Sequence, residues 1–172
     1  DFTNDFPGLI SKVGKINAFK NAPTPLNQAI YNALENFKDR VGRRAIIVIS
    51  DGADTASAIT ADVVHEASKR ADVRIYAIAI QQLGLATGRG FSNDQASILL
   101  RGLADVTGGD SYFPYSSSEF LQIFRTIAEE LRSQYSIGYA APKVDDNDWR
   151  TIEVKVEGGT ARTKQGYYPN EY

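Results

Sequence analysis

The stretch Arg43–Thr55, RRAIIVISDGADT, decides the fold of this chain. Its apolar run Ala45–Ile49 has the length and the β-branched residues of a strand that is covered on both faces. Asp51 and Asp54 follow soon after this run. Because open α/β sheets bind their ligands at the carboxyl ends of parallel strands, the sequence predicts a functional site beside Asp51.

Helical and strand patterns alternate on both sides of this strand. Apolar residues spaced three and four apart predict amphipathic helices, and short β-branched runs predict further strands. This alternation is typical of βαβ crossovers and predicts a parallel sheet flanked by helices. The predicted helices are a short one capped by Asp5, one containing Leu26–Phe37, Ala61–Ala71, Asp94–Val106 and a long one after Ser116, and the predicted strands are Arg43–Ser50, Val73–Ile80 and Ser111–Tyr115.

Polar residues mark the starts of the helices. Thr60 is expected to cap the helix Ala61–Ala71, and Ser116 with Glu119 has the spacing of a capping box. The apolar residues expected to face inward from Ala61–Ala71 are Val63, Val64 and Ala67.

The pattern changes at Tyr135, where apolar and small or charged residues begin to alternate. Such alternation predicts antiparallel strands with one solvated face, around 135–139 and 152–156. Gly158 and Gly159 predict a turn into a last strand, Ala161–Tyr168. We therefore expect an α/β region over 1–134 and a β appendix over 135–172 that packs on the same domain.

Composition excludes several classes of protein. The chain has 172 residues, of which 42% are hydrophobic, so it can bury one sizeable core. The 19 basic and 21 acidic residues are mixed, which argues against nucleic acid as a partner. The absence of cysteine excludes disulfides and thiolate metal sites. No apolar run approaches the roughly 20 residues of a membrane helix, and we expect no membrane partner.

Enzymatic readings of the sequence find little support. Asp51 and Asp54 are three residues apart, whereas the nucleophile loop of haloacid-dehalogenase-like phosphatases has acids two apart. His65 is expected on the polar, solvated side of its helix. Motifs of serine hydrolases, P-loops and dinucleotide-binding loops are missing from the sequence. The sequence therefore predicts a protein that is not an enzyme.

Four stretches, ISDGADT, VRIYAIAI, LRGLADVTGGDSYFP and IAEELRSQYSIGYAAP, carry a family resemblance. The chain resembles the later part of a von Willebrand factor A domain, in particular the group related to it in bacteria of the acidobacterial type. The resemblance implies a partial Rossmann-like α/β fold. In that family a divalent cation is held by an Asp-x-Ser-x-Ser loop, a Thr and an Asp. Thr24 and Asp51 match the last two, and Asp54 would hold a water next to the ion.

The resemblance implies Mg²⁺, or Mn²⁺ or Ca²⁺, in an intact parent protein. The Asp-x-Ser-x-Ser loop does not occur in this sequence, which begins after the first three strands of the family. One carboxylate cannot replace enough of the ion's hydration shell, so we expect no tightly held metal in this chain. The truncation should also leave strand Arg43–Ser50 with an exposed edge through which the chain could form a homo-oligomer.

Both predicted ligands have simpler interpretations. Thr24 could be a helix N-cap ahead of Pro25, and Asp51 could begin a βα turn before Gly52. The resemblance favours a noncatalytic module for protein binding and adhesion, which grips an acidic residue of an unknown protein partner through the metal. The alternative is a structural or assembly domain with a vestigial metal site, which binds through its aromatic C-terminal appendix. The resemblance also favours a secreted or periplasmic protein.

Overall fold

The computed structural model describes residues 2–17, 22–51, 53–80, 95–140 and 146–169. Within these residues β1 (Ala45–Ser50), β2 (Arg74–Ala79) and β3 (Ser111–Tyr112) form a sheet in the order β1-β2-β3. Both pairings are parallel, with Ala45 opposite Arg74 and Ala77 opposite Ser111. The predicted parallel α/β sheet is confirmed.

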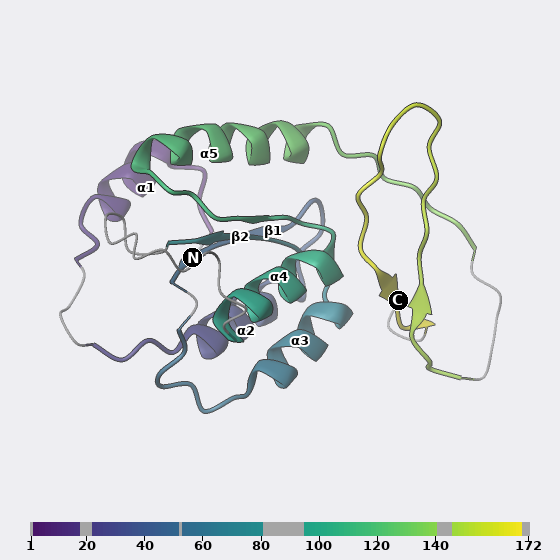
Figure 1. Ribbon diagram of the computed structural model, residues 1–172, viewed down its shortest axis with the longest axis horizontal. Coiled ribbons are helices and arrows are strands. Elements are labelled where there is room, and N and C mark those ends of the chain that lie inside the picture. The colour runs from purple at the N-terminus through teal and green to yellow at the C-terminus, as the bar shows by residue number, and fades with distance from the viewer. Residues whose placement is uncertain (1, 18–21, 52, 81–94, 141–145, 170–172) are drawn as a thin grey trace.

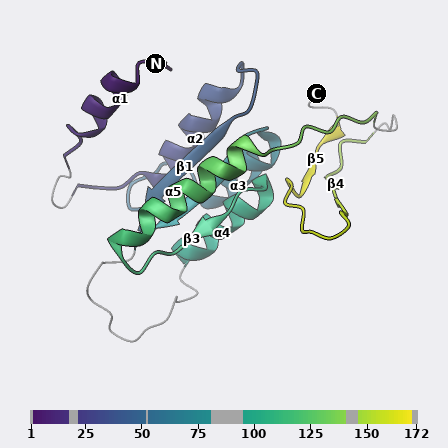
Figure 2. The same cartoon turned by 90° about the horizontal axis from the view of Figure 1, so that it is seen from above.

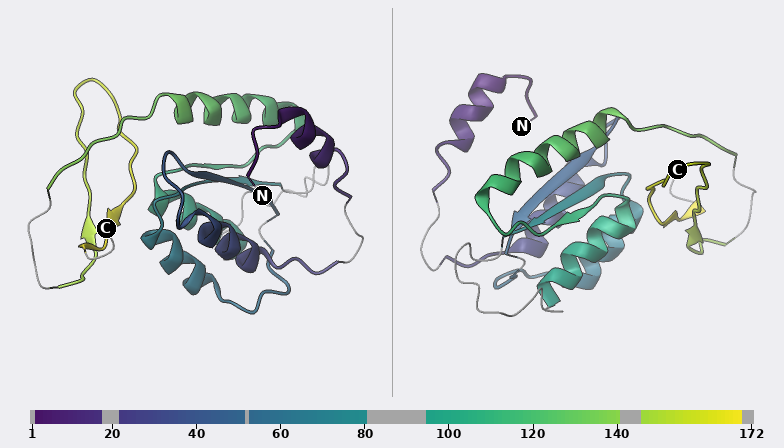
Figure 3. Two further views of the ribbon diagram at one scale, coloured as in Figure 1. Left: turned by 180° about the vertical axis from the view of Figure 1, so that it is seen from behind. Right: turned by 45° about the horizontal axis from the view of Figure 1, so that its top comes forward.

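Helices cover both faces of this sheet (Figure 1). Helix α5 lies along one face, and α2, α3 and α4 lie along the other, as Figures 2 and 3 also show. Each helix that was predicted is present. Their bounds are α1 Phe6–Val13, α2 Leu26–Phe37, α3 Ala61–Arg70, α4 Gln95–Thr107 and α5 Ser117–Arg132. The predicted loop Gln81–Phe91 lies outside the described residues.

Of the two apolar cores that the described residues form, the larger lies between the sheet and the helices α2, α3 and α4. Alternate residues of β2 point into it, as expected for a strand that is covered on both faces. Burial of this kind is the main favourable term in folding. The buried members of this core are Leu26, Ile30, Leu34, Val48, Val64, Val73, Ile75, Ala77, Ala79, Leu100 and Leu103.

The second core lies beneath α5. The other face of β2 supplies Tyr76 and Ile78, which pack against the fully buried Ile127 of α5. On β1, however, Ile47 and Ile49 remain 41% and 48% exposed. The part of this face that belongs to β1 is therefore poorly covered by the described part of the chain, and β1 is an edge strand there.

The turn after α4 packs closely against β2 on one side and against the backbone of Thr163 and Lys164 on the other. Gly108 has a φ of 74°, a conformation that glycine adopts without strain. A Cβ on Gly109 would overlap the carbonyl oxygen of Ile75 in β2. Just before this turn, the Thr107 hydroxyl accepts a 3.0 Å hydrogen bond from the backbone N–H of Ile75. These contacts fix the end of α4 against the central strand.

Two helix starts agree with the predicted caps and a third differs. The side chains of Asp5 and Thr60 accept hydrogen bonds from the N–H groups of Gly8 and Val63, respectively. Ser116 does not cap the backbone of α5. Its hydroxyl instead donates to the Glu119 carboxylate at 2.9 Å, so the expected capping box does not form.

Helix α3 faces the core differently from the prediction. Val64 is fully buried, but Val63 is exposed and Ser68 is buried in its place. The Ser68 hydroxyl donates to the carbonyl of Val64 within the helix, which satisfies the buried hydroxyl. His65 is half-buried rather than solvated, because α4 approaches it at Gly102.

The C-terminal strands are shorter than predicted. β4 (Arg150–Thr151) pairs with β5 (Gly166–Tyr167) in an antiparallel sheet, and the residues 135–139 and 152–156 are not strands. The alternating side chains Tyr135, Ile137 and Tyr139 are 92%, 76% and 63% exposed. Their alternation is typical of a strand, but in the described residues no strand forms there, and Tyr139 meets the ring of Tyr167 in β5, edge-on, with ring centres 6.2 Å apart.

Candidate functional site

The candidate site lies at the carboxyl edge of the sheet, where β1 ends. Asp51 comes directly after β1 and is exposed. Its Oδ1 atom accepts a 3.1 Å hydrogen bond from the backbone N–H of Ala53. This bond is the local turn contact that the simpler interpretation of Asp51 predicts, and it holds the carboxylate at the sheet edge.

Asp54 is the most strongly held residue of this loop. One oxygen, Oδ2, accepts hydrogen bonds from the backbone N–H of Asn27, at 2.7 Å, and from the hydroxyl of Ser57. The other, Oδ1, accepts from the backbone N–H groups of Ala56 and Ser57, at 3.2 and 2.9 Å. Asp54 therefore organises its own loop and binds the start of α2.

The loop after β1 thus caps a helix that has no side-chain cap of its own. Pro25 is the N-cap residue of α2 and makes no side-chain hydrogen bond. The first-turn N–H groups of Asn27 and Gln28 instead donate to Asp54 and to the Ser57 hydroxyl, at 2.7 and 3.0 Å. A carboxylate at a helix N-terminus also interacts favourably with the helix dipole.

These contacts change the acidity of Asp54. Hydrogen bonds from Ser57 and from the N–H of Asn27 lower the pKa of the Asp54 carboxyl from 3.8 to about 2. They do so because each donor stabilises the charged form. The expectation that Asp54 holds a water next to a metal ion remains a prediction. In the structure, the Asp54 carboxylate accepts hydrogen bonds from Asn27, Ala56 and Ser57.

Thr24 lies beside the same loop. Its backbone N–H donates to the Thr55 hydroxyl at 2.8 Å, and its carbonyl accepts from the N–H of Thr55 at 2.9 Å. The alternative role of Thr24 as a helix N-cap is wrong, since Pro25 takes that position. The structure therefore joins the loop of Thr24 to the loop that contains Asp51.

The donors of this loop pair do not by themselves fit a divalent metal. A small hard cation requires several oxygen ligands. Thr24 and Asp51 supply one hydroxyl and one carboxylate, while both oxygens of Asp54 already accept hydrogen bonds. Across the described ranges, no group of three or more acidic or histidine side chains could hold an ion. A metal centre here would need donors beyond these.

Sequence patterns missed the roles of Ser57 and Thr55. Both lie just after the acidic pair and connect the loop to the turn before α2. Because α2 begins at Leu26, one residue later than a cap at Thr24 requires, Pro25 stands at the N-cap and offers no side-chain acceptor, so the cap comes from another segment. Asp54 and Ser57 are that cap.

The architecture defines a class of protein, the open parallel α/β domains, in which ligands generally bind at the carboxyl ends of the strands. The chain belongs to the von Willebrand factor type A domain family, whose sequence profile matches residues 2–130. Domains of this family generally mediate protein–protein interactions and are typically noncatalytic.

One solved structure supports this fold, and a second match is reported beside it. An aerotolerance-related membrane protein from Bacteroides fragilis NCTC 9343, with multiple mutations to serines, is similar with a TM-score of 0.54 and 18% identity, over 77% of this chain and 71% of that one. An uncharacterized membrane spanning protein from Vibrio fischeri gives a TM-score of 0.42 and 24% identity, over 74% and 67%. The search of curated proteins gave no match. No helix in the described ranges is both long and apolar enough to cross a membrane.

Proposed function

We propose that this chain is a noncatalytic protein-recognition module, and that its contact region is the sheet edge around Thr24 and Asp51. The observation that carries the proposal is the pair of hydrogen bonds between Thr24 and Thr55, because it holds the turn before α2 against the loop after β1. Thr24 and Asp51 are exposed in these joined loops, where a partner could reach them. Membership of the von Willebrand factor A family supports the same conclusion.

A finer form of this proposal adds a metal ion. By family resemblance, a Mg²⁺-type ion would grip an acidic side chain of the partner protein, with Thr24 and Asp51 among its ligands. The chemistry that the ion supplies is a positive charge that accepts a carboxylate. Because the donors present here are too few, this form requires a longer chain that carries the Asp-x-Ser-x-Ser loop of the family.

Thermal unfolding in the presence of Mg²⁺ or Mn²⁺ tests the metal-dependent form. We expect no saturable stabilisation of this chain, and saturable stabilisation of a longer chain that contains the Asp-x-Ser-x-Ser loop, since a ligand that binds only the folded state raises its stability. Asp51→Ala should abolish that stabilisation. Asp39→Ala, which removes another exposed carboxylate, is the matched control. A longer chain that Mg²⁺ fails to stabilise contradicts the metal-dependent form.

A second function is favoured by the exposure of Tyr135, Ile137 and Tyr139. Tyrosine is enriched at the energetic centres of protein interfaces, and these three side chains face solvent along one extended segment. In this alternative the chain is an assembly domain with a vestigial metal site. Replacing Tyr135 and Tyr139 by Ser would then abolish assembly, measured by light scattering, whereas Asp51→Ala would leave it unchanged.

We propose a secreted or periplasmic protein, which rests on the resemblance alone. A screen with hydrolase substrates should show no turnover. Turnover that Asp51→Ala abolished would contradict the noncatalytic assignment.

A further inference from the structure

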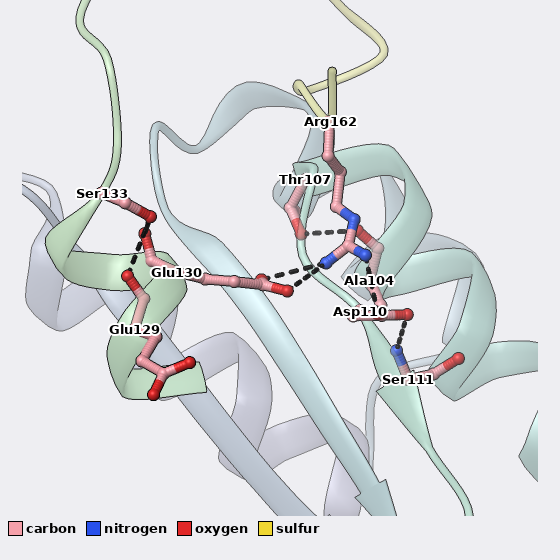
Figure 4. Close-up of polar contacts among 8 residues, drawn as sticks. All are labelled: Ala104, Thr107, Asp110, Ser111, Glu129, Glu130, Ser133 and Arg162. Atoms are coloured by element: carbon pink, nitrogen blue, oxygen red, sulfur yellow. Dashed lines mark hydrogen bonds and ion pairs between the residues drawn. The ribbon is translucent and has the colours of Figure 1, made fainter. Parts of the chain in front are cut away.

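Residues 146–169, here called the C-terminal strap, lie at the end of the α/β body opposite the candidate site. They carry β4 and β5 and stand beside the ends of α3, α4 and α5 (Figure 1). Arg162 of the strap points back into the body and lies between two carboxylates, Asp110 and Glu130 (Figure 4). One amino group of Arg162 is 3.0 Å from each oxygen of Glu130, and the other is 2.9 Å from Asp110 Oδ2.

These two carboxylates come from different elements of the body. Asp110 precedes β3, and Glu130 is in the last turns of α5. We call the pair the acidic notch. One nitrogen of the guanidinium group bonds both oxygens of Glu130 and the other pairs with Asp110, so two carboxylates share the charge of Arg162. Although burial opposes its charge, Asp110 and Glu130 raise the pKa of the Arg162 guanidinium above its usual value.

The acidic notch is held in place by contacts that do not involve the strap. Asp110 Oδ1 accepts a 2.8 Å hydrogen bond from the N–H of Ser111, and the Asp110 carbonyl accepts one of 2.9 Å from Ala77 in β2. Glu130 is carried by α5, which the fully buried Ile127 anchors on the sheet. The notch should therefore keep its shape when Arg162 is removed.

Two tyrosines add buried polar groups near the notch. The hydroxyl oxygens of Tyr76 and Tyr112 are buried and have no hydrogen-bond partner among the described residues. Burial, then the charges of Glu130 and Asp110, raise the pKa of Tyr112 to about 12. Both hydroxyls stay protonated at neutral pH. Both hydroxyls lie close enough to Glu130 for its charge to raise their pKa, after the larger effect of burial.

The strap backbone at Thr163 and Lys164 packs closely on Gly108, and other contacts of the strap with the body are polar or between cations and aromatic rings. Lys69 and Arg70 of α3 lie 5.4 Å and 4.3 Å from the ring centres of Trp149 and Tyr168. The Tyr168 hydroxyl donates to Glu66 at 3.1 Å. None of the apolar side chains described in the strap belongs to either core. Contacts of this kind are modest in strength and can be exchanged for solvent.

We propose that the acidic notch is a guanidinium-binding site, that Arg162 is its internal occupant, and that the strap is a releasable element whose departure opens the notch to an arginine side chain of a protein partner. This role is separate from recognition at the sheet edge around Asp51. The strap thereby competes with such a partner, because both would use the same two carboxylates.

Amide hydrogen exchange tests whether the strap is released as a unit. In Arg162→Ala, the amides of Ile152 and Gln165, which donate to Gln165 and Val106, should exchange at least about tenfold faster. The amides of β2 should change by less than about twofold, since the cores are untouched. Lys155→Ala, which removes a strap lysine paired only with the exposed Glu153, is the matched control. Unchanged strap exchange, or acceleration of β2 to the same degree, overturns the releasable strap.

Methylguanidinium chloride tests the notch itself. At millimolar concentration it should shift the amide resonance of Ser111, which donates to Asp110, in Arg162→Ala but not in the wild type. Sodium chloride at equal ionic strength should have no such effect. If Arg162→Ala fails to fold, Glu130→Gln tests the strap in the same exchange experiment. The absence of a methylguanidinium-specific shift in the folded variant overturns the guanidinium site.

Discussion

The Asp54 carboxylate accepts a 2.7 Å hydrogen bond from the backbone N–H of Asn27, and a loop residue after β1 thereby caps the helix α2. A single side chain thus fixes both the conformation of the loop after β1 and the start of a helix that precedes that strand in the sequence. The candidate site depends on this contact, since Thr24 and Asp51 belong to the two segments that Asp54 joins.

Replacing Asp54 should change how stability depends on pH. Its folded pKa of about 2 lies below its ordinary value of 3.8, so the folded state binds fewer protons than the unfolded state between these values. The stabilisation is therefore present above about pH 4 and is lost as the pH falls toward 2. Urea unfolding of the wild type and Asp54→Asn should show a deficit for the variant near neutral pH that shrinks in acid. A deficit that stays constant down to about pH 2 contradicts this.

The hydroxyl of Thr107 should matter more than its methyl group. Thr107→Val leaves the buried N–H of Ile75 without its acceptor, which should cost about 1 to 3 kcal/mol in the free energy of unfolding. Thr107→Ser keeps the hydroxyl and should recover most of that loss. Denaturant unfolding measures both. Equal stability of the Val and Ser variants would show that the hydrogen bond to β2 contributes nothing.

Gly109 should tolerate no side chain. In Gly109→Ala the new Cβ would overlap the carbonyl of Ile75, so α4 and β2 must separate, at a cost of about 3 kcal/mol or more. Gly138→Ala is the matched control, because the space around Gly138 is open. Thermal unfolding compares the two variants. A Gly109→Ala protein as stable as the wild type would be inconsistent with this close approach.

The exposed edge of β1 predicts self-association. Ile47 and Ile49 face solvent, and no described strand pairs with the outer side of β1. Exposed edges of this kind template pairing with another chain, and charges on them prevent it. We expect concentration-dependent oligomers in light scattering that Ile49→Lys abolishes. A strictly monomeric wild type, with slow amide exchange in β1, contradicts the prediction.

Local patterns were sufficient to predict the α/β body. The β-branched run Ala45–Ile49 predicted β1, and the spacing of apolar residues predicted α2, because both signals arise from burial of one continuous segment. The capping roles of Asp5 and Thr60 were also local, since a cap contacts N–H groups within three residues.

Local sequence patterns could not predict the contacts between segments that are far apart in the sequence. The bond from Asn27 to Asp54 depends on how two loops meet in space. The same holds for His65, whose burial depends on α4, and for the appendix, where alternation at Tyr135 predicted a strand that does not form. Of the predicted ligands, Thr24 and Asp51 lie in joined loops, while their binding of metal stays a prediction.

Trp149 is the only tryptophan of the chain, and it sits in the C-terminal strap against Lys69 and Tyr168. Its fluorescence therefore reports whether the strap is attached to the α/β body. The fluorescent side chains of the parallel sheet are tyrosines, such as Tyr76 and Tyr112. A thermal unfolding curve followed by tryptophan fluorescence gives the temperature at which the strap detaches. Circular dichroism gives the temperature at which the helices unfold. The difference between the two midpoints measures how independently the strap and the α/β body unfold.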